Sequence, residues 1–170
     1  MEFRYCPLCG NPLGTIENDA VKRWYCSTCG RKHYRNPTVG VAGVLFEKGR
    51  LLLVKRGDGV SYEKQWCIPC GHVEWGEDVR EACRREFLEE TGIEAAVEAV
   101  FAVHSNFHDP QHLTVGIWFR MKRIGGKLEA GSDASDVRFF PLDRIPEKMA
   151  FPTDLLVIEK LKMNLTTGRL

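Results

Sequence analysis

The sequence predicts a mixed-sheet α/β or α+β domain that follows a small N-terminal module. Residues 1–36 are rich in Cys, Gly, Pro, Asn and charged side chains, with little continuous apolar sequence from which a core could form. After them, runs of β-branched and leucine residues alternate with two segments of helical pattern, as in domains that pack helices on a sheet. We therefore expect the module to occupy residues 1–36 and the larger domain residues 37–170.

The larger domain is expected to begin with strands. Residues 38–46 (TVGVAGVLF) and 51–55 (LLLVK) are rich in residues that favour strands, and the turn at residues 47–50 between them predicts a hairpin. Residues 57–65 have the polar, glycine-containing composition of a loop. A short strand is expected at residues 66–69.

The first helix is expected at residues 77–91. Good helix formers fill this stretch, Glu77 and Asp78 make its start acidic, and Gly92 stands where a helix commonly ends. Because these local signals agree, the sequence predicts both ends of this helix.

Strands are expected to follow the first helix. They are predicted at residues 94–103, 112–122 and 137–140, where apolar and β-branched residues are frequent. Residues 105–111 and 125–132 contain turn-forming residues and are expected to be loops.

A second helix is expected at residues 153–164. Apolar residues recur there at helical spacing: Leu155, Leu156, Ile158 and Leu161. Thr153 or Asp154 is the predicted cap at its start, because hydroxyl and carboxylate oxygens accept hydrogen bonds from the first free N–H groups.

The composition is that of an ordinary globular protein, with 44% hydrophobic and 28% charged residues. The net charge of +1 provides no broad basic field, so a long nucleic acid is not expected as a partner. The start, MEFRYCPLCG, is charged where a signal peptide has an apolar core, and the longest apolar run, residues 39–46, is far shorter than the roughly 20 residues of a membrane helix. We therefore expect a cytoplasmic protein with no membrane partner.

Four of the seven cysteines have the spacing of zinc ligands. Cys6 and Cys9 form one C-x2-C pair, Cys26 and Cys29 form another, and sixteen residues separate the pairs. Four thiolates close a tetrahedral shell, which is typical of a structural zinc ion, and the ion would stabilise a segment that lacks an apolar core. The sequence therefore predicts a zinc ribbon.

Two alternatives to a purely structural zinc ribbon stay open. The cysteines could form disulfides or remain free thiols, although a reducing compartment favours metal binding. The ribbon also carries basic side chains that could contact nucleic acid, but a solvated basic face accounts for them equally well: Arg23, Arg31, Lys32 and Arg35.

The first helix contains a conflict between charge and packing. At about 100° per residue, Glu86 and Glu90 lie on the same face as the apolar residues Val79 and Cys83. Like charges at this spacing repel one another, and partial burial strengthens the repulsion. Carboxylate oxygens are the ligands that Mg²⁺ and Mn²⁺ prefer, so the pattern indicates a divalent cation site; a solvated acidic face would not explain the two inward glutamates.

The segment from residue 71 to residue 93 closely resembles the Nudix box, Gly-x5-Glu-x7-Arg-Glu-U-x-Glu-Glu-x-Gly-U, in which U is apolar. Every position is filled, by Gly71, Glu77, Arg85, Glu86, Phe87, Glu89, Glu90, Gly92 and Ile93. The resemblance implies a Nudix α/β/α sandwich with a mixed sheet over about residues 38–165. It also implies metal-dependent hydrolysis of the diphosphate bridge in a nucleoside diphosphate linked to another moiety, by attack of water on phosphorus.

The same resemblance implies roles for individual residues. Glu86, Glu89 and Glu90 would bind Mg²⁺ or Mn²⁺, and the Gly71 carbonyl could add a ligand. Glu77 and Arg85 would support them.

Two further residues are candidates for the chemistry. The general base is not constant in this family, and our candidate is Asp136, as base or auxiliary ligand, because many members carry an acidic residue at such a place before a strand. The alternative is a solvent-facing turn residue. Arg56 is a candidate phosphate clamp, with a plain surface arginine as its alternative.

The loop before the box departs from the family pattern. It normally resembles Trp-x-x-Pro-Gly-Gly, whereas residues 66–71 read WCIPCG, so Cys70 replaces a glycine. With Cys67 it forms a C-x2-C pair. This pair could have a redox role or bind an inhibitory metal ion, and the alternative is that the two thiols only pack against each other.

The resemblance favours ADP-ribose or FAD as substrate. Zinc-ribbon NADH pyrophosphatases carry a Ser-Gln-Pro-Trp-Pro-Phe-Pro-x-Ser stretch after the box that is absent here, so NADH ranks lower. Pro110 lies at a distance from the box that resembles the ADP-ribose branch, and His104 and Phe107 are candidate substrate contacts. A nucleotide-sensing module and an RNA-cap or damaged-nucleotide hydrolase remain the alternatives, and a homodimer is expected from the resemblance alone.

Overall fold

The computed structural model describes residues 3–18 and 21–168 of the chain. It contains two compact units, residues 1–37 and residues 38–170. No helix in the described ranges is long and apolar enough to cross a membrane.

The N-terminal unit is a small antiparallel sheet whose strands lie in the order β1-β2-β3. They are β1 (Gly14–Asn18), β2 (Val21–Tyr25) and β3 (Lys32–His33). Among the described residues of this unit, only Cys6 and Cys26 are buried. The residues described in this unit therefore form no apolar core, as expected from the composition.

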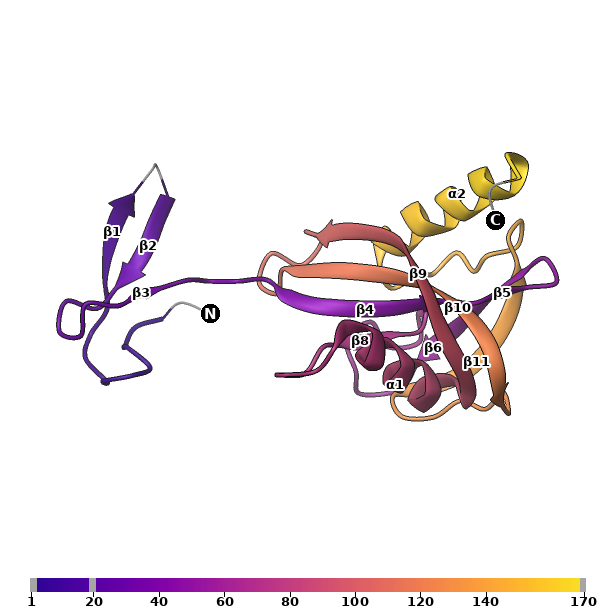
Figure 1. Cartoon of the computed structure of the whole chain (residues 1–170), viewed down its shortest axis with the longest axis horizontal. Coiled ribbons are helices and arrows are strands. Elements are labelled where there is room, and N and C mark those ends of the chain that lie inside the picture. The colour runs from indigo at the N-terminus through magenta and orange to yellow at the C-terminus, as the bar shows by residue number, and fades with distance from the viewer. Residues whose placement is uncertain (1–2, 19–20, 169–170) are drawn as a thin grey trace. The chain divides into compact units, whose positions relative to one another are not determined.

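The second unit is built on two sheets (Figure 1). A mixed sheet has the order β8-β4-β10-β9, in which β4 and β10 are parallel and the other pairs are antiparallel. An antiparallel sheet has the order β11-β6-β5, with β7 also paired to β6. The bounds are β4 (Thr38–Val44), β5 (Phe46–Glu47), β6 (Arg50–Arg56), β7 (Trp66–Cys67), β8 (Cys70–His72), β9 (Ile93–Asn106), β10 (Thr114–Gly126) and β11 (Ala134–Pro141).

Two helices, α1 (Val79–Thr91) and α2 (Pro152–Thr166), cover opposite faces of these sheets (Figure 1). The alternation of side chains along β6 shows the two layers, because Leu51 and Leu53 belong to the core cluster that contains α2, whereas Leu52 belongs to the cluster that contains α1. The expected α/β/α sandwich with a mixed sheet is therefore confirmed.

The predicted hairpin at residues 38–55 is only partly correct. Pairing is confined to Phe46 with Leu51 and Glu47 with Arg50, with one further hydrogen bond from Leu52 N to Leu45 O. Beyond it the two strands separate: β4 joins β10 in the mixed sheet and β6 joins β11 in the other. Consecutive residues of both strands are buried, so each strand is covered on two faces. Each can therefore form part of a different sheet.

The two helices begin differently. Asp78 caps α1 and accepts a hydrogen bond from Arg80 N at 2.8 Å, and Gly92 ends the helix in the left-handed region at φ 67°. At α2 the predicted cap is wrong, because the N-cap is Phe151 and it makes no side-chain hydrogen bond. Thr153 and Asp154 lie inside the first turn and are buried. The side chain of Asp154 therefore lies in the core and does not cap the helix.

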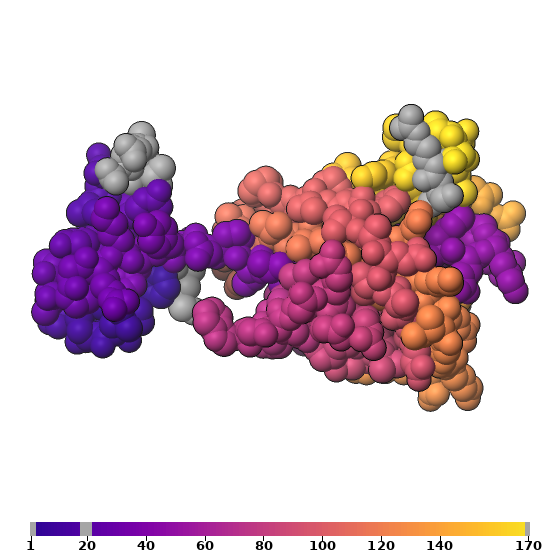
Figure 2. All heavy atoms as spheres, viewed as in Figure 1, coloured from indigo at the N-terminus to yellow at the C-terminus, as the bar shows by residue number. Residues whose placement is uncertain are grey.

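The segment between β8 and α1 projects from the surface of its unit (Figure 2). Within it Trp75 is fully exposed. The chain then returns to the sheet at Asp78, so the glutamates of α1 approach β8.

Candidate active site

The glutamates of α1 differ in how far they point towards the core. Glu90 is buried at 1% exposure, on the same face as Cys83 and Phe87. The side chain of Glu86 is 18% exposed and that of Glu89 is 47% exposed. The inward orientation expected for Glu86 and Glu90 is therefore observed, and Glu89 lies at the edge of the same face.

Gly71 and Glu86 are in direct contact across β8 and α1. A Cβ atom at position 71 would overlap the carboxyl group of Glu86, so only glycine leaves room for that group. The glutamate carboxyl thus lies against the backbone of β8 in the segment that precedes the helix.

Glu90 is held from the same segment. Its Oε2 accepts a hydrogen bond from Cys70 N at 2.8 Å. Burial raises the pKa of Glu90 well above its ordinary value, the Cys70 N–H lowers it, and the charges of Asp133 and Glu86 raise it further. A buried carboxylate among other carboxylates is stabilised by a cation, which makes this face a candidate metal site.

Arg85 connects the helix to the loop before it. Its guanidinium donates to both oxygens of Glu77, at 2.8 Å and 2.9 Å, and to Oε1 of Glu86 at 2.8 Å. Nη1 also lies 3.5 Å from Glu89, and Nη2 donates to His72 O at 3.2 Å. The hydrogen bonds from Arg85 lower the pKa of Glu77 to about 2, so this carboxylate stays ionised. The arrangement supports the positions of the other glutamates without occupying all their oxygens.

Arg56 is the last residue of β6. Its Nε donates to Ser61 O at 2.6 Å, and its Nη2 lies 3.4 Å from Asp133. Burial lowers its pKa, but the charges of neighbouring acidic groups, Asp133 and Glu90 among them, raise it, and the net shift is upward. The side chain of Arg56 is only 14% exposed, so it is not a plain surface arginine.

The structure brings a different aspartate to this site than the one chosen from the sequence. Asp136 forms an ion pair with Arg138 at 2.6 Å, and Arg138 in turn lies over Trp66, on the α2 side of the sheet. Asp133, three residues earlier, contacts Arg56 and influences Glu90. The sequence reads SDASD at this point, and nothing local in it shows which of the two aspartates pairs with Arg56. β11 has a register shift against β6 between Ala134 and Asp136.

The two other predicted substrate contacts lie on β9 and directly after it. His104, on β9, stacks edge-on against Trp118 with 5.5 Å between ring centroids. Phe107 follows β9 and is 71% exposed. Neither has a described contact with α1.

Cys67 and Cys70 are free cysteines whose side chains are in contact with each other. The hydrogen bond with Cys67 and burial raise the pKa of Cys70 well above its ordinary value, so this thiol stays protonated. A protonated Cys70 thiol beside the buried Cys67 fits the packing account of this C-x2-C pair.

The four N-terminal cysteines meet at one point. Their sulfur atoms all lie within 4.8 Å of one another, with Cys6–Cys29 at 3.7 Å and Cys9–Cys26 at 3.5 Å. A disulfide would require about 2 Å, whereas the edge of a tetrahedron with zinc–sulfur bonds of about 2.3 Å is about 3.8 Å. Hydrogen bonds from Asn11 lower the pKa of Cys9 to about 6, towards the thiolate that a metal binds.

His33 is a neighbour of this cluster that sequence reasoning missed. Its Nε2 lies 3.4 Å from the sulfur of Cys6. The position of His33 only four residues after Cys29 was the available signal, since a histidine close to a C-x2-C pair is often involved in a zinc site.

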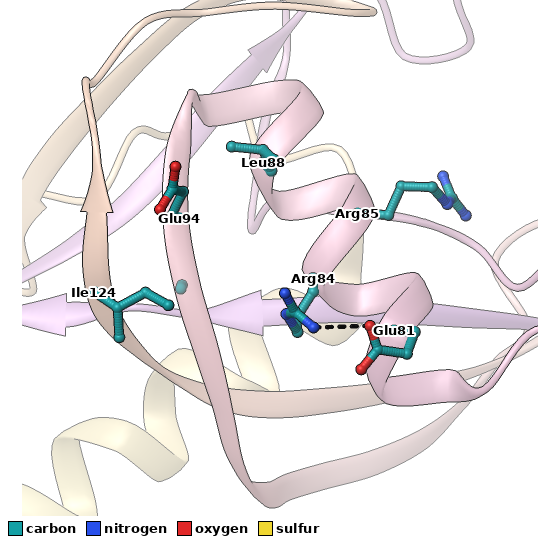
Figure 3. A pocket seen from close by; sticks show the side chains of 7 residues that line it. Glu81, Arg84, Arg85, Leu88, Glu94 and Ile124 are labelled. Carbon is teal, nitrogen blue, oxygen red and sulfur yellow. Dashed lines mark hydrogen bonds and ion pairs between the residues drawn. The ribbon is translucent and has the colours of Figure 1, made fainter.

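A surface pocket of about 380 Å³ lies beside α1, but it is separate from the glutamate face (Figure 3). Its lining comes from α1, β9 and β10: Glu81, Arg84, Arg85, Leu88, Glu94, Ala95 and Ile124. Glu81 and Leu88 lie on the side of the helix roughly opposite Glu90, at about 100° per residue. The site is therefore defined by the inward glutamates and not by this pocket.

Comparison with known proteins identifies the family. A model of the NUDIX domain matches residues 34–161. The ADP-ribose pyrophosphatase of Methanocaldococcus jannaschii is 35% identical over 130 residues, which are 76% of this chain and 76% of that protein. The NAD-capped RNA hydrolase NudC of Stutzerimonas stutzeri is 26% identical over 155 residues, 85% of this chain but only 50% of that protein.

A solved structure extends the similarity to the fold. The crystal structure of a NUDIX hydrolase from Nitrosomonas europaea has a TM-score of 0.80 at 27% identity, covering 96% of this chain and 91% of that chain. The family match spans most of the chain and includes the whole of α1 with its glutamates. The chain therefore belongs to the Nudix family, as a pyrophosphate hydrolase.

Proposed function

We propose that this chain hydrolyses the diphosphate bridge of ADP-ribose or FAD, with NADH a poorer substrate. The observation that carries the proposal is the set of inward glutamates, Glu86 against Gly71 and Glu90 against Cys70 N, beside the cation Arg56. The relative from Methanocaldococcus jannaschii, which bears the name ADP-ribose pyrophosphatase, supports the choice of ADP-ribose.

Glu86, Glu89 and Glu90 are the proposed ligands for Mg²⁺ or Mn²⁺, with the Gly71 carbonyl as a further one. These are oxygen donors of the kind that hard divalent cations require, and the burial of the Glu90 carboxyl, which raises its pKa, supports the proposal. A divalent cation bound there would neutralise the diphosphate and favour attack by water.

Phosphate binding, positioning of the glutamates and acceptance of a proton are proposed for other side chains of this protein. Arg56 would contact a phosphate oxygen, since no described residue hydrogen-bonds its Nη1, and Arg85 would hold Glu77 and Glu86 in place. Asp133 is our first candidate to accept the proton of the attacking water, because it neighbours both Arg56 and Glu90. Asp136 is the second candidate.

The N-terminal cysteines are proposed to hold a structural Zn²⁺. Their sulfur–sulfur separations suit a tetrahedral shell, and all four positions of that shell would be filled by Cys6, Cys9, Cys26 and Cys29. The ion would supply the stability that the small unit lacks in its apolar core.

An activity screen tests the proposed reaction. ADP-ribose, FAD, NADH, NAD-capped RNA and nucleoside triphosphates are each incubated with wild type and Mg²⁺ or Mn²⁺, and the products are separated by chromatography. ADP-ribose should yield AMP and ribose 5-phosphate, and Glu89→Gln should lower kcat by roughly 100-fold or more. Glu81→Gln, on the solvent face of the same helix, is the matched control and should retain activity.

Two outcomes would redirect the proposal. Cleavage of capped RNA alone would favour the activity after which NudC is named. Tight binding of one nucleotide with no cleavage by wild type would instead indicate a nucleotide-sensing module.

A further inference from the structure

Three aromatic rings from distant parts of the sequence meet beside Arg56. Tyr62 lies in the loop after β6, His108 in the loop after β9, and Phe151 at the start of α2. The ring centroids are 5.3 Å apart for Tyr62–Phe151, 5.5 Å for Tyr62–His108 and 5.8 Å for His108–Phe151. We call Tyr62, His108 and Phe151 the aromatic cluster.

The aromatic cluster is continuous with the proposed phosphate site. The guanidinium carbon of Arg56 lies 5.8 Å from the centre of the Phe151 ring. The same guanidinium lies 3.4 Å from Asp133 and interacts electrostatically with Glu90. Arg56 is therefore a neighbour of both the glutamate face and the aromatic cluster, and a nucleotide likewise has a phosphate at one end and a planar base at the other.

The rings are not simply part of the core. Tyr62 and Phe151 are half-buried and pack with Cys67 and Ala150, whereas His108 is exposed. The cluster therefore has an inner side supported by the core and an outer side that remains accessible, as a stacking surface requires.

The backbone that presents Tyr62 is held in an uncommon conformation. Tyr62 and Lys64 have φ values of 60° and 63°, in the left-handed region that non-glycine residues rarely adopt. The loop is closed by hydrogen bonds from Arg56 N to Gln65 O at 2.9 Å and from Lys64 N to Arg56 O at 3.0 Å. The surrounding bonds keep the loop in this conformation, and such local strain is concentrated at ligand-binding sites.

The hydrogen bonding of His108 leaves one ring atom available to a ligand. Its Nδ1 lies 2.6 Å from Oδ1 of Asn106, which also accepts from the hydroxyl of Thr153 at 3.4 Å. Because an amide oxygen only accepts, Nδ1–H donates this hydrogen bond, and a ring that carries its proton on Nδ1 presents Nε2 as an acceptor. This atom is suited to the exocyclic amino group of adenine.

We infer that the aromatic cluster is the nucleobase subsite, where the adenine of the substrate stacks while Arg56 contacts its phosphate. The inference rests on the proposed function and adds to it the residues that select the nucleoside end of the substrate. Stacking of one base on an aromatic side chain contributes about 1–3 kcal/mol, or roughly 5- to 150-fold in affinity.

The test compares ADP-ribose with diribosyl diphosphate, which keeps both riboses and the diphosphate but has no base. Tyr62→Ala and His108→Ala should each raise KM for ADP-ribose about 10-fold with less than 2-fold change in kcat. KM for the base-free compound should stay unchanged. Tyr62→Phe keeps the ring and should behave as wild type, and Trp75→Ala, which removes a fully exposed ring outside the cluster, is the control.

The hydrogen-bonding role of His108 has its own readout. Wild type should prefer ADP-ribose to inosine diphosphate ribose, which has an oxygen in place of the amino group. His108→Phe keeps an aromatic ring without the acceptor and should lose this preference. An unchanged preference would remove this role.

Two results would overturn the subsite. One is a Tyr62→Ala variant whose KM rises equally for both compounds, which would indicate general disturbance of the active site. The other is a raised KM in Trp75→Ala but not in the cluster variants. If wild type cleaves neither compound, the proposed function fails separately, and calorimetric binding of ADP-ribose with Mg²⁺ to wild type and Tyr62→Ala still tests the subsite, with equal affinities contradicting it.

Discussion

The carboxyl group of Glu86 occupies the space that any side chain at position 71 would need. This relationship links the first residue of the Nudix box, the glycine on β8, with a glutamate fifteen residues later on α1. It explains in steric terms why the segment has glycine there, since the backbone must come close to a carboxylate that faces inward.

Gly71→Ala is therefore expected to abolish activity with little loss of stability. The added methyl group meets only the flexible end of Glu86, which can rotate away, so the free energy of unfolding should fall by no more than about 1–2 kcal/mol. The displaced carboxylate should lower kcat/KM at least about 100-fold. Urea unfolding and ADP-ribose hydrolysis, measured on the same preparation, separate the two effects.

Gly40→Ala is the matched control for this substitution. Its Cβ would meet the methyl group of Thr114 at 3.2 Å and, at the ordinary contact distance of 3.6 Å, the carbonyl oxygen of Gly71, but no glutamate is among its nearest atoms. It should keep most of the activity, and an equally inactive Gly40→Ala would show that any added methyl group in this sheet is harmful.

The contact between Arg85 and Glu77 predicts a measurable change in a pKa. The pKa of Glu77 is lowered to about 2 by the hydrogen bonds from Arg85, compared with the ordinary value of 4.5. Its ionised form therefore stabilises the fold above about pH 4.5, and this contribution is lost as the pH falls through about 2. In Arg85→Gln the pKa should return towards 4.5, as followed by ¹³C NMR of the glutamate carboxyl groups. A Glu77 resonance that still titrates near 2 in the variant would show that another group holds the carboxylate.

Asp154 predicts a pH dependence of stability with the opposite sign. It is buried, its Oδ2 accepts from Ile68 N at 2.9 Å, and its Oδ1 accepts from Trp118 Nε1 at 3.0 Å. Burial raises its pKa from 3.8 to about 7, so the folded state binds a proton that the unfolded state releases. The contribution to stability is present below about pH 4 and is lost as the pH rises through about 7.

Asp154→Asn should remove this component, which is on the order of a few kcal/mol. Urea unfolding at a series of pH values from 4 to 8 is expected to show a shallower slope for Asp154→Asn than for wild type. Asp58→Asn, whose side chain is 82% exposed, serves as the control and should follow the wild-type slope. Parallel slopes for wild type and Asp154→Asn would contradict the raised pKa.

The cysteine cluster predicts the zinc content of two variants. Cys6→Ser removes one of four sulfur ligands, so bound zinc measured by mass spectrometry should fall from about one ion per chain towards zero. Cys83→Ser changes a buried cysteine of the other unit and should retain the full zinc content. Full zinc in Cys6→Ser would exclude the four-cysteine site.

Local signals predicted the parts of the fold that depend on neighbouring residues. The ends of α1 were predicted within two residues, because the acidic start at Asp78 and the left-handed Gly92 act within a single turn. The inward glutamates of this helix were predicted in the same way, since a helical period places Glu86 and Glu90 on the face of Cys83.

Features that depend on distant partners could not be read from the sequence. The strands of the expected hairpin separate because β10 and β11 offer each a longer partner. The sequence position of Asp154 is that of a helix cap. In the structure its carboxylate lies in the core and accepts hydrogen bonds from Ile68 N and Trp118 Nε1. Asp133 pairs with Arg56 and Asp136 with Arg138, and SDASD contains no local signal for this difference.

Binding of Mn²⁺ to wild type and Glu86→Gln, followed by electron paramagnetic resonance, tests the central claim most directly. Wild type is expected to bind Mn²⁺ with an affinity at least about 10-fold higher than Glu86→Gln, because the amide replaces a charged oxygen ligand with a neutral group. Glu81→Gln, on the opposite face of α1, should bind as wild type does. Equal Mn²⁺ affinities for wild type and Glu86→Gln would contradict the claim that the inward glutamates of α1 form the cation site of this hydrolase.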